Sequence, residues 1–298
     1  MACGNLVLMP QSYDRAAEDL GNVVALEHVN TWIPDQQLAT AFYISALGLT
    51  RDPYLMTGTD NMWANVGRSQ FHLPSAKPQV LRGRVGIVLP GREALLARLA
   101  RARKPLEGTR FAFAEHEGYV ETVSPWGNVI RCHDPHPGFG RMRLGMPYVE
   151  LDVPPAAAEG IARFYRQIVG APARHEDGVT RVSVGPDQVL IYRETERKLP
   201  PYDGHHVQIY LADFSGPYLR LLERGLVSEE SDQHQYRFTD LVDPANGKKL
   251  FVLEHEVRSM RHPLYARPLV NRDPAQSNVD YAPGYDATPA VLPRAERR

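Results

Sequence analysis

The chain has 298 residues, enough for two domains of ordinary size, and its 34 basic and 35 acidic residues leave a formal charge of -1. This balance offers no basic surface for nucleic acid, and the two cysteines are too few for a disulfide framework or a thiolate metal cluster. No stretch has the roughly eighteen uncharged apolar residues needed to span a membrane, and the first residues lack a signal-peptide pattern, so we expect a cytoplasmic protein without a membrane partner.

Residues 1–22 are predicted to be an N-terminal extension, and the first structural unit begins directly after it. A strand over residues 26–33 is followed by Asp35 as a helix N-cap, by apolar residues at helical spacing, and by Gly48 as the helix stop. Short strands follow, separated by a turn at Gly67. This order of elements predicts a βαβββ unit.

The sequence repeats itself. Residues 41–48 (AFYISALG) return as residues 163–170 (RFYRQIVG), and residues 66–71 return as residues 184–189 at nearly the same offset. Two segments that repeat at nearly the same offset indicate a structural repeat. Further opening strands start near residues 84, 148 and 206. We therefore predict an α+β fold of four βαβββ modules, at residues 24–75, 82–133, 146–195 and 204–256.

Consecutive modules are predicted to pair into two domains, at residues 23–135 and 146–257, each a cupped mixed sheet with its helices outside. Residues 258–298 remain as a C-terminal strap and tail. Prolines limit regular structure in the strap, while Tyr265 and Leu269 give it apolar anchors. We therefore expect the strap to lie across the sheets.

Three of the four opening strands are polar on one face. Because side chains alternate along a strand, the shared faces are His28, Asn30 and Trp32 in the first module, Tyr148, Glu150 and Asp152 in the third, and His206, Gln208 and Tyr210 in the fourth. Such a face indicates either a sheet curved around a wet cavity or the solvent side of a one-sided sheet.

These features resemble the vicinal oxygen chelate superfamily, which includes glyoxalase I, bleomycin-resistance proteins and type I extradiol dioxygenases. The resemblance rests on the two repeated helix ends, at residues 42–48 and 164–170, on the strand openings at His28 and His206, and on the turn at residues 124–128. It implies the fold more strongly than the reaction, since one scaffold hosts several chemistries. The four-module length resembles the two-domain extradiol dioxygenases in particular.

That resemblance implies an iron site in the C-terminal domain, held by two histidines and one glutamate. His206 occupies one histidine position, but Tyr148 stands at the other, and Glu254 lies three residues beyond the carboxylate position. The predicted catalytic residues are His206, Tyr148, Tyr210 and Glu150, and the predicted metal ligands are His206 and Glu254. The implied cofactor is a divalent metal, with iron the best fit and manganese or zinc next.

Glyoxalase-like metal positions fall at His28, His72, Arg84 and Arg131 in the first two modules. Two imidazoles suit a metal, but two guanidinium groups repel a cation. The four groups together suit a carboxylate or phosphate instead. The alternative is that the arginines pair with Glu121 or other acids.

The resemblance predicts an enzyme that acts on a small oxygenated or aromatic molecule, dioxygenase-like or glyoxalase-like, with an incomplete metal triad. One alternative is a metal-free binding or sequestering protein of the bleomycin-resistance type. Another is a metal-independent isomerase or lyase that uses His206 as its base. No nucleic-acid partner is expected, and a homo-oligomer is compatible with the resemblance.

Overall fold

The structure, a computed structural model, describes residues 13–55 and 60–271 and contains the four predicted βαβββ modules. The first comprises β1 (Val23–Asn30), α1 (Gln36–Ala39), the π-helix η2 (Thr40–Ala46), β2 (Thr50–Arg51), β3 (Asn61–Val66) and β4 (Ser69–Pro74). The second comprises β5 (Gly83–Val88), α2 (Arg92–Ala102), β6 (Ala112–His116), β7 (Tyr119–Val123) and β8 (Val129–His133).

The third module comprises β9 (Gly145–Val153), α3 (Ala158–Phe164), the π-helix η4 (Tyr165–Val169), β10 (Ala173–Glu176), β11 (Val179–Ser183) and β12 (Val189–Glu194). The fourth comprises β13 (His206–Leu211), α4 (Ser215–Leu222), β14 (Val227–Asp232), β15 (Gln235–Val242) and β16 (Lys249–Ser259). Two short 3-10 helices, η1 (Ala16–Glu18) and η3 (Pro137–Phe139), lie outside the modules.

The repeated sequence segments form the same local structure. Asp35 caps α1 by accepting hydrogen bonds from the backbone N–H groups of Gln37 and Leu38. Both repeated helices end as π-helices, at η2 and η4. Gly48 and Gly170, which follow them, have φ values of 80° and 81°, where a side chain would be strained.

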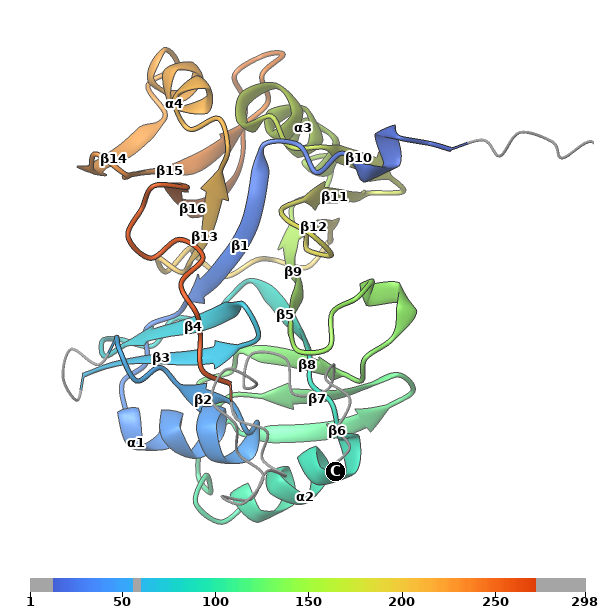
Figure 1. Ribbon diagram of the computed structural model, residues 1–298, viewed down its shortest axis with the longest axis vertical. Coiled ribbons are helices and arrows are strands. Elements are labelled where there is room, and N and C mark those ends of the chain that lie inside the picture. Colours follow the sequence, from blue (N-terminus) through green and yellow to red (C-terminus); the bar gives the residue numbers. More distant parts are fainter. Residues whose placement is uncertain (1–12, 56–59, 272–298) are drawn as a thin grey trace, which may run out of the picture.

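The modules pair differently from the prediction. One eight-stranded sheet has the order β14-β15-β16-β13-β1-β4-β3-β2, and the other has the order β10-β11-β12-β9-β5-β8-β7-β6 (Figure 1). The first module therefore shares a sheet with the fourth, and the second shares a sheet with the third. Neither sheet is formed within residues 23–135 or within residues 146–257 alone. The prediction that consecutive modules share a sheet is therefore corrected, because each sheet combines one module from each of these two ranges.

The opening strands explain this pairing. Within each module the opening strand is an edge strand, so it has free backbone groups that need a partner. β5 and β9, which open two modules that follow each other in the chain, pair with each other in antiparallel orientation. β1 and β13 are then left to pair with each other, also antiparallel, across most of the chain.

The apolar sides of the strands and the helices form one continuous core. The helix α3 contacts β10, β11 and β12 of one sheet and β15 of the other. In this region the Tyr165 hydroxyl lies 2.5 Å from both the Tyr192 hydroxyl and His255 Nε2, and all three side chains are buried.

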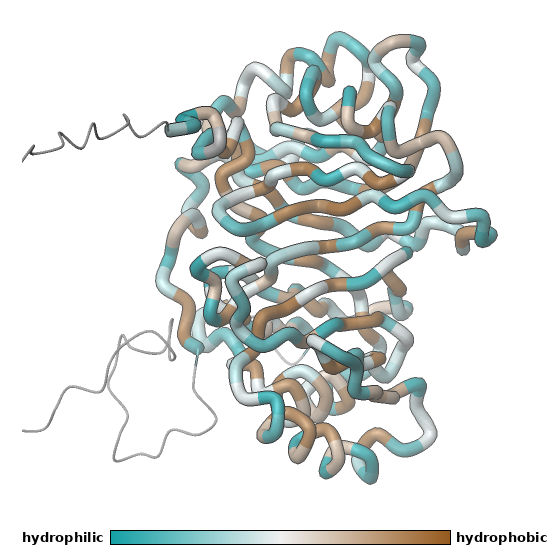
Figure 2. Tube along the Cα trace, turned by 90° about the vertical axis from the view of Figure 1, so that its right-hand side faces the viewer, coloured by the Kyte–Doolittle hydropathy of each residue, from teal (hydrophilic) through white to brown (hydrophobic). Residues whose placement is uncertain are grey.

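Hydrophobic and hydrophilic positions interleave along the strands (Figure 2). The opposite strand faces are therefore free to carry polar groups.

Residues 260–271 follow β16 and run across the sheet that contains β1 and β13 (Figure 1). The Tyr265 ring packs edge-on against Tyr210, with centroids 4.9 Å apart. Arg267 Nη2 lies 2.5 Å from Asp52 Oδ2, and the Asn271 side chain bonds the backbone of Gly67. The tail predicted after residue 271 lies outside the described residues. Among the helices described, none is long and apolar enough to cross a membrane.

Candidate functional site

The strand register arranges polar side chains in rows on one face of the first sheet. Across its four central strands, one row contains Glu254, His206, Asn30 and His72, and the next row contains Glu256, Gln208, His28 and Gln70. Residues two apart on a strand share a face, so both rows lie on the same side. Four strands from two distant modules thus contribute to one polar surface.

Four of these residues occupy equivalent positions in the two modules. Asp35 and Asp213 each accept a backbone hydrogen bond at the start of the helix that follows the opening strand. His28 and His206 lie seven residues before these aspartates. On the closing strands, His72 and Glu256 lie two residues beyond the register partners of His28 and His206. We call His28, His72, His206 and Glu256 the ligand quartet.

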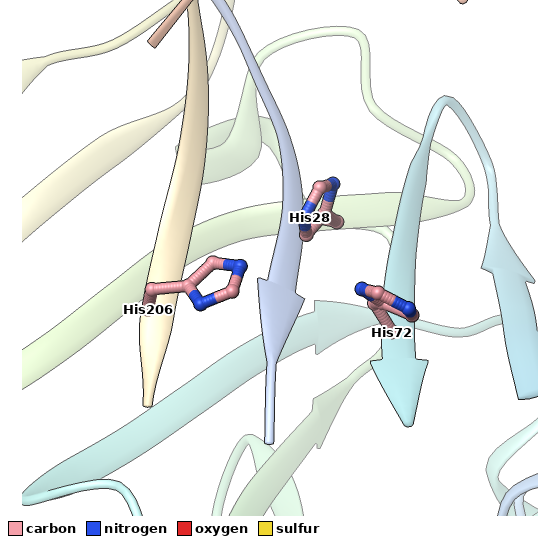
Figure 3. Close-up of side chains that lie close together, drawn as sticks. All are labelled: His28, His72 and His206. Atoms are coloured by element: carbon pink, nitrogen blue, oxygen red, sulfur yellow. The ribbon is translucent and has the colours of Figure 1, made fainter. Parts of the chain in front are cut away.

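The three imidazoles of the quartet point toward one another (Figure 3). Each offers a nitrogen, and the offered nitrogens all lie within 4.8 Å of one another. The Nε2 atoms of His28, His72 and His206 are buried and have no hydrogen-bond partner among the described residues. Glu256 Oε2 lies 3.5 Å from His206 Nε2. An unpaired buried polar atom costs about 1–3 kcal/mol, so three such nitrogens in one place form a donor set that a metal ion could satisfy.

The other ring nitrogens each face a polar side chain. His28 Nδ1 lies 3.3 Å from Glu27 Oε2, and His206 Nδ1 lies 3.2 Å from Glu254 Oε1. His72 Nδ1 lies 2.7 Å from the Asn30 amide, whose oxygen takes that place when the amide is turned over. Metal-binding histidines are typically oriented in this way, with one nitrogen on a carboxylate or carbonyl and the other on the metal.

The protonation states also suit a metal. Burial lowers the pKa of His72 to about 2 and that of His28 well below its usual value, so both rings are neutral. Burial raises the pKa of Glu256, but the adjacent His206 imidazole and the Arg258 charge outweigh this effect, and the net shift is downward. Neutral imidazole and ionised carboxylate are the forms that bind metal ions.

Two arginines hold the carboxylate of Glu256. Arg237 Nη2 lies 2.6 Å from Glu256 Oε2, and Arg258 Nη2 lies 2.6 Å from Glu256 Oε1. Arg237 also pairs with Glu254. The Glu256 side chain is only 4% exposed, so this pairing lets a buried carboxylate stay ionised. The arginines fix Glu256 beside His206.

A β-bulge brings a further carboxylate to this face. The pairing of β1 with β13 shifts register between Leu26 and His28, which places Glu27 beside His28 on the polar face. The Tyr210 hydroxyl donates to Glu27 Oε1 at 3.2 Å, and Arg258 donates to Glu27 Oε2 at 3.0 Å. Burial raises the pKa of Glu27. Strict alternation assigns Glu27 to the opposite face, so sequence reasoning missed it.

The structure brings some predicted residues together and separates others. His206, Tyr210 and Glu254 share the polar face with His28 and His72. The predicted partners of His206 in the third module, Tyr148 and Glu150, lie on β9 in the other sheet. The expected convergence of all four catalytic residues is therefore corrected, because the third and fourth modules belong to different sheets.

Glu256 was missed for a different reason. In the shorter second module, the candidate position on the closing strand lies four residues after the turn glycine, Gly127. The same count from Gly247 ends at Phe251, well before Glu256. The strand β16 has 11 residues and two register shifts against β15, so its ligand position lies near its far end. Glu256 is identified only from the pairing of β16 with β13. The same pairing places Glu254, the residue predicted as a metal ligand, next to His206 Nδ1.

The second sheet has no comparable ligand set among its described residues. Equivalent positions there are occupied by Arg84, Arg131, Tyr148 and Ile191. Arg131 pairs with Glu121 at 2.9 Å, and Arg84 pairs with Asp152 at 3.1 Å. These arginines therefore already have carboxylate partners, which removes the basis for an anion site formed with His28 and His72 in the first sheet.

Comparisons with known proteins agree with the fold. No family model and no curated protein sequence matches this chain. The crystal structure of glyoxalase I from Zea mays is similar with a TM-score of 0.55 and 13% identity, over 78% of this chain and 92% of that one. A putative dioxygenase from Bacillus subtilis has a TM-score of 0.54 and 16% identity, over 81% of this chain and 86% of that one. The chain has the fold of the vicinal oxygen chelate superfamily.

Proposed function

We propose that this chain is a metal-dependent enzyme acting on a small molecule with two neighbouring oxygen atoms, and that the ligand quartet holds a divalent metal ion. The observation that carries the proposal is the set of three buried Nε2 atoms without partners, whose rings are each fixed through Nδ1. A six-coordinate ion with four protein ligands keeps two positions open, the number that a pair of neighbouring oxygens fills.

The donor set narrows the choice of metal. Three imidazoles and one carboxylate, without a thiolate, suit iron, zinc, nickel or manganese rather than copper(I) or calcium. When bound, the metal would supply Lewis acidity to the substrate oxygens. The extradiol triad of two histidines and one glutamate from the third and fourth modules is not assembled, since Tyr148 lies in the other sheet. The proposed centre uses instead the three histidines contributed by the first and fourth modules.

The surrounding charges favour a substrate with one negative charge. Glu27, Glu254 and Glu256 face Arg237 and Arg258, so these five groups carry one net negative charge when all are ionised. A divalent ion converts this to one net positive charge. An anionic oxygen pair would then neutralise the site, and a buried site is most stable when its charges are balanced.

Other side chains would fix the geometry of the site. The Trp63 ring stacks on His72 with centroids 3.7 Å apart and the ring planes 14° from parallel. The Tyr210 hydroxyl is committed to Glu27, which in turn contacts His28. These contacts hold two of the imidazoles before a metal arrives, which reduces the ordering needed on binding.

The test is metal content by elemental analysis of protein purified without chelator and then offered Fe(II), Mn(II), Zn(II) or Ni(II). We expect about one ion per chain in the parent protein and loss of that ion in His72→Ala and His206→Ala. His133→Ala is the matched control, since His133 is a half-buried histidine on the closing strand β8 of the other sheet. A parent protein that binds none of these ions would refute the proposal and favour a metal-free binding protein.

A further inference from the structure

Gln208 is the most unusual side chain beside the ligand quartet. It lies on β13, two residues after His206 and on the same face, and none of its surface is exposed. Its Nε2 and its Oε1 both lack a hydrogen-bond partner among the described residues. A buried amide with both ends unpaired is destabilising in the folded protein, so its presence requires an explanation.

The register places Gln208 at the centre of the site. Its cross-strand partners are His28 on one side and Glu256 on the other, both members of the ligand quartet. Asn30 is its counterpart in the first module, between His206 and His72. The Asn30 amide uses one end on His72 and leaves the other end unpaired. Unpaired amide groups therefore lie between the ligands in both rows.

Gln208 offers a donor and an acceptor from one rigid group. A carboxylate pair such as oxalate can use only the donor, because it has no proton to give. A ligand with a hydroxyl next to a carboxylate or carbonyl oxygen can use both ends. Sites built to hydrogen-bond a substrate hydroxyl discriminate strongly against analogues that lack it, since the buried partner is then left unpaired.

We propose that Gln208 is a specificity-determining residue that hydrogen-bonds the oxygen ligand of the metal, and that it selects hydroxy-carboxylate or hydroxy-carbonyl compounds over compounds with two unprotonated oxygens. This inference rests on the proposed metal site. Gln208 would hydrogen-bond the substrate, whereas the ligand quartet would bind the metal. The two roles can therefore be separated by experiment.

The first test uses the metal-free protein and needs no ligand. Replacing an unpaired amide with an apolar side chain of similar size removes its desolvation cost, so Gln208→Leu is expected to raise the midpoint of thermal unfolding by about 2 °C or more. The matched control is Gln70→Leu in the same row. Its amide donates to Asp52 and Asn65, so the same substitution is expected to lower the midpoint. A lower midpoint in Gln208→Leu would overturn the inference.

The second test uses Co(II)-loaded protein, with glycolate and oxalate as probes and the visible Co(II) spectrum as the signal. Gln208→Leu is expected to bind one Co(II) as the parent does, but to bind glycolate about tenfold or more weakly, with a smaller loss for oxalate. An unchanged ratio of the two affinities would overturn the inference. If the parent protein binds no metal, the proposed function fails, while the unfolding comparison still decides whether Gln208 is unpaired.

Discussion

Arg267 is expected to anchor residues 260–271 to the sheet through one buried ion pair. Its partner Asp52 has a side chain with no exposed surface, and Arg267 itself is 15% exposed. Removing one member of a buried pair typically costs about 3–5 kcal/mol, because the other charge is left without a partner. Asp52 keeps hydrogen bonds from Gln70 and from the backbone of Tyr54 and Leu55, so we expect the lower end, about 3 kcal/mol.

The perturbation is Arg267→Met, which keeps the apolar stem, and the assay is urea unfolding combined with amide hydrogen exchange of residues 260–271. The control is Arg261→Met, because Arg261 is exposed and has no ion pair among the described residues. We expect faster exchange in Arg267→Met only, and partial recovery of stability when Asp52→Asn is added. A loss of less than about 1 kcal/mol with unchanged exchange would show a weak, solvent-screened pair and refute the reasoning.

The same pair predicts a dependence on pH. Burial raises the pKa of Asp52, but the hydrogen bonds from Arg267 and from the backbone of Tyr54 and Leu55 outweigh it, so the folded pKa lies below the usual value. A carboxyl with a lowered folded pKa stabilises the protein above its unfolded pKa, about 3.9. The difference between parent and Arg267→Met should therefore be constant from neutral pH down to about pH 5. It should shrink as the pH falls below about 4.

Four further substitutions test the site and its surroundings. Glu256→Gln should abolish stoichiometric metal binding, whereas Glu254→Gln should lower metal affinity only about 10–100-fold in a chelator competition; equal losses would contradict their different roles. Tyr165→Phe removes the hydroxyl shared with His255 and should cost about 1–3 kcal/mol in urea unfolding with metal content unchanged, and a neutral effect would speak against that network. Arg131→Met, in the other sheet, should change stability by less than about 1 kcal/mol, and any loss of metal would place the site there instead.

The modules were predictable because their signals are local. The cap at Asp35, the helix stop at Gly48 and the repeated helix end all lie within a few residues of the structure they specify. Alternation along the strands likewise identified the polar faces that carry His28 and His206. The three histidines of the site were therefore recognisable from the sequence, whereas Glu256 was not.

The joining of the two halves was not predictable from local signals. Alternation states which face a side chain occupies, but it does not state which module supplies the neighbouring strand. The free edges of β1 and β13 pair across more than 170 residues, and nothing near His28 encodes that choice. Glu27 and Glu256 were missed for a related reason, since a bulge and a long closing strand each change the count on which a position depends.

The order of the sheets has a consequence for how the protein is made. The quartet extends from residue 28 to residue 256, so the site cannot close until nearly the whole chain has left the ribosome. Until β13 has been synthesised, the edge of β1 that pairs with it stays unpaired and could pair with strands of other chains. A chain cut between the second and third modules would separate His28 and His72 from His206 and Glu256. If the proposed metal site exists, metal uptake would report the reassociation of the two fragments.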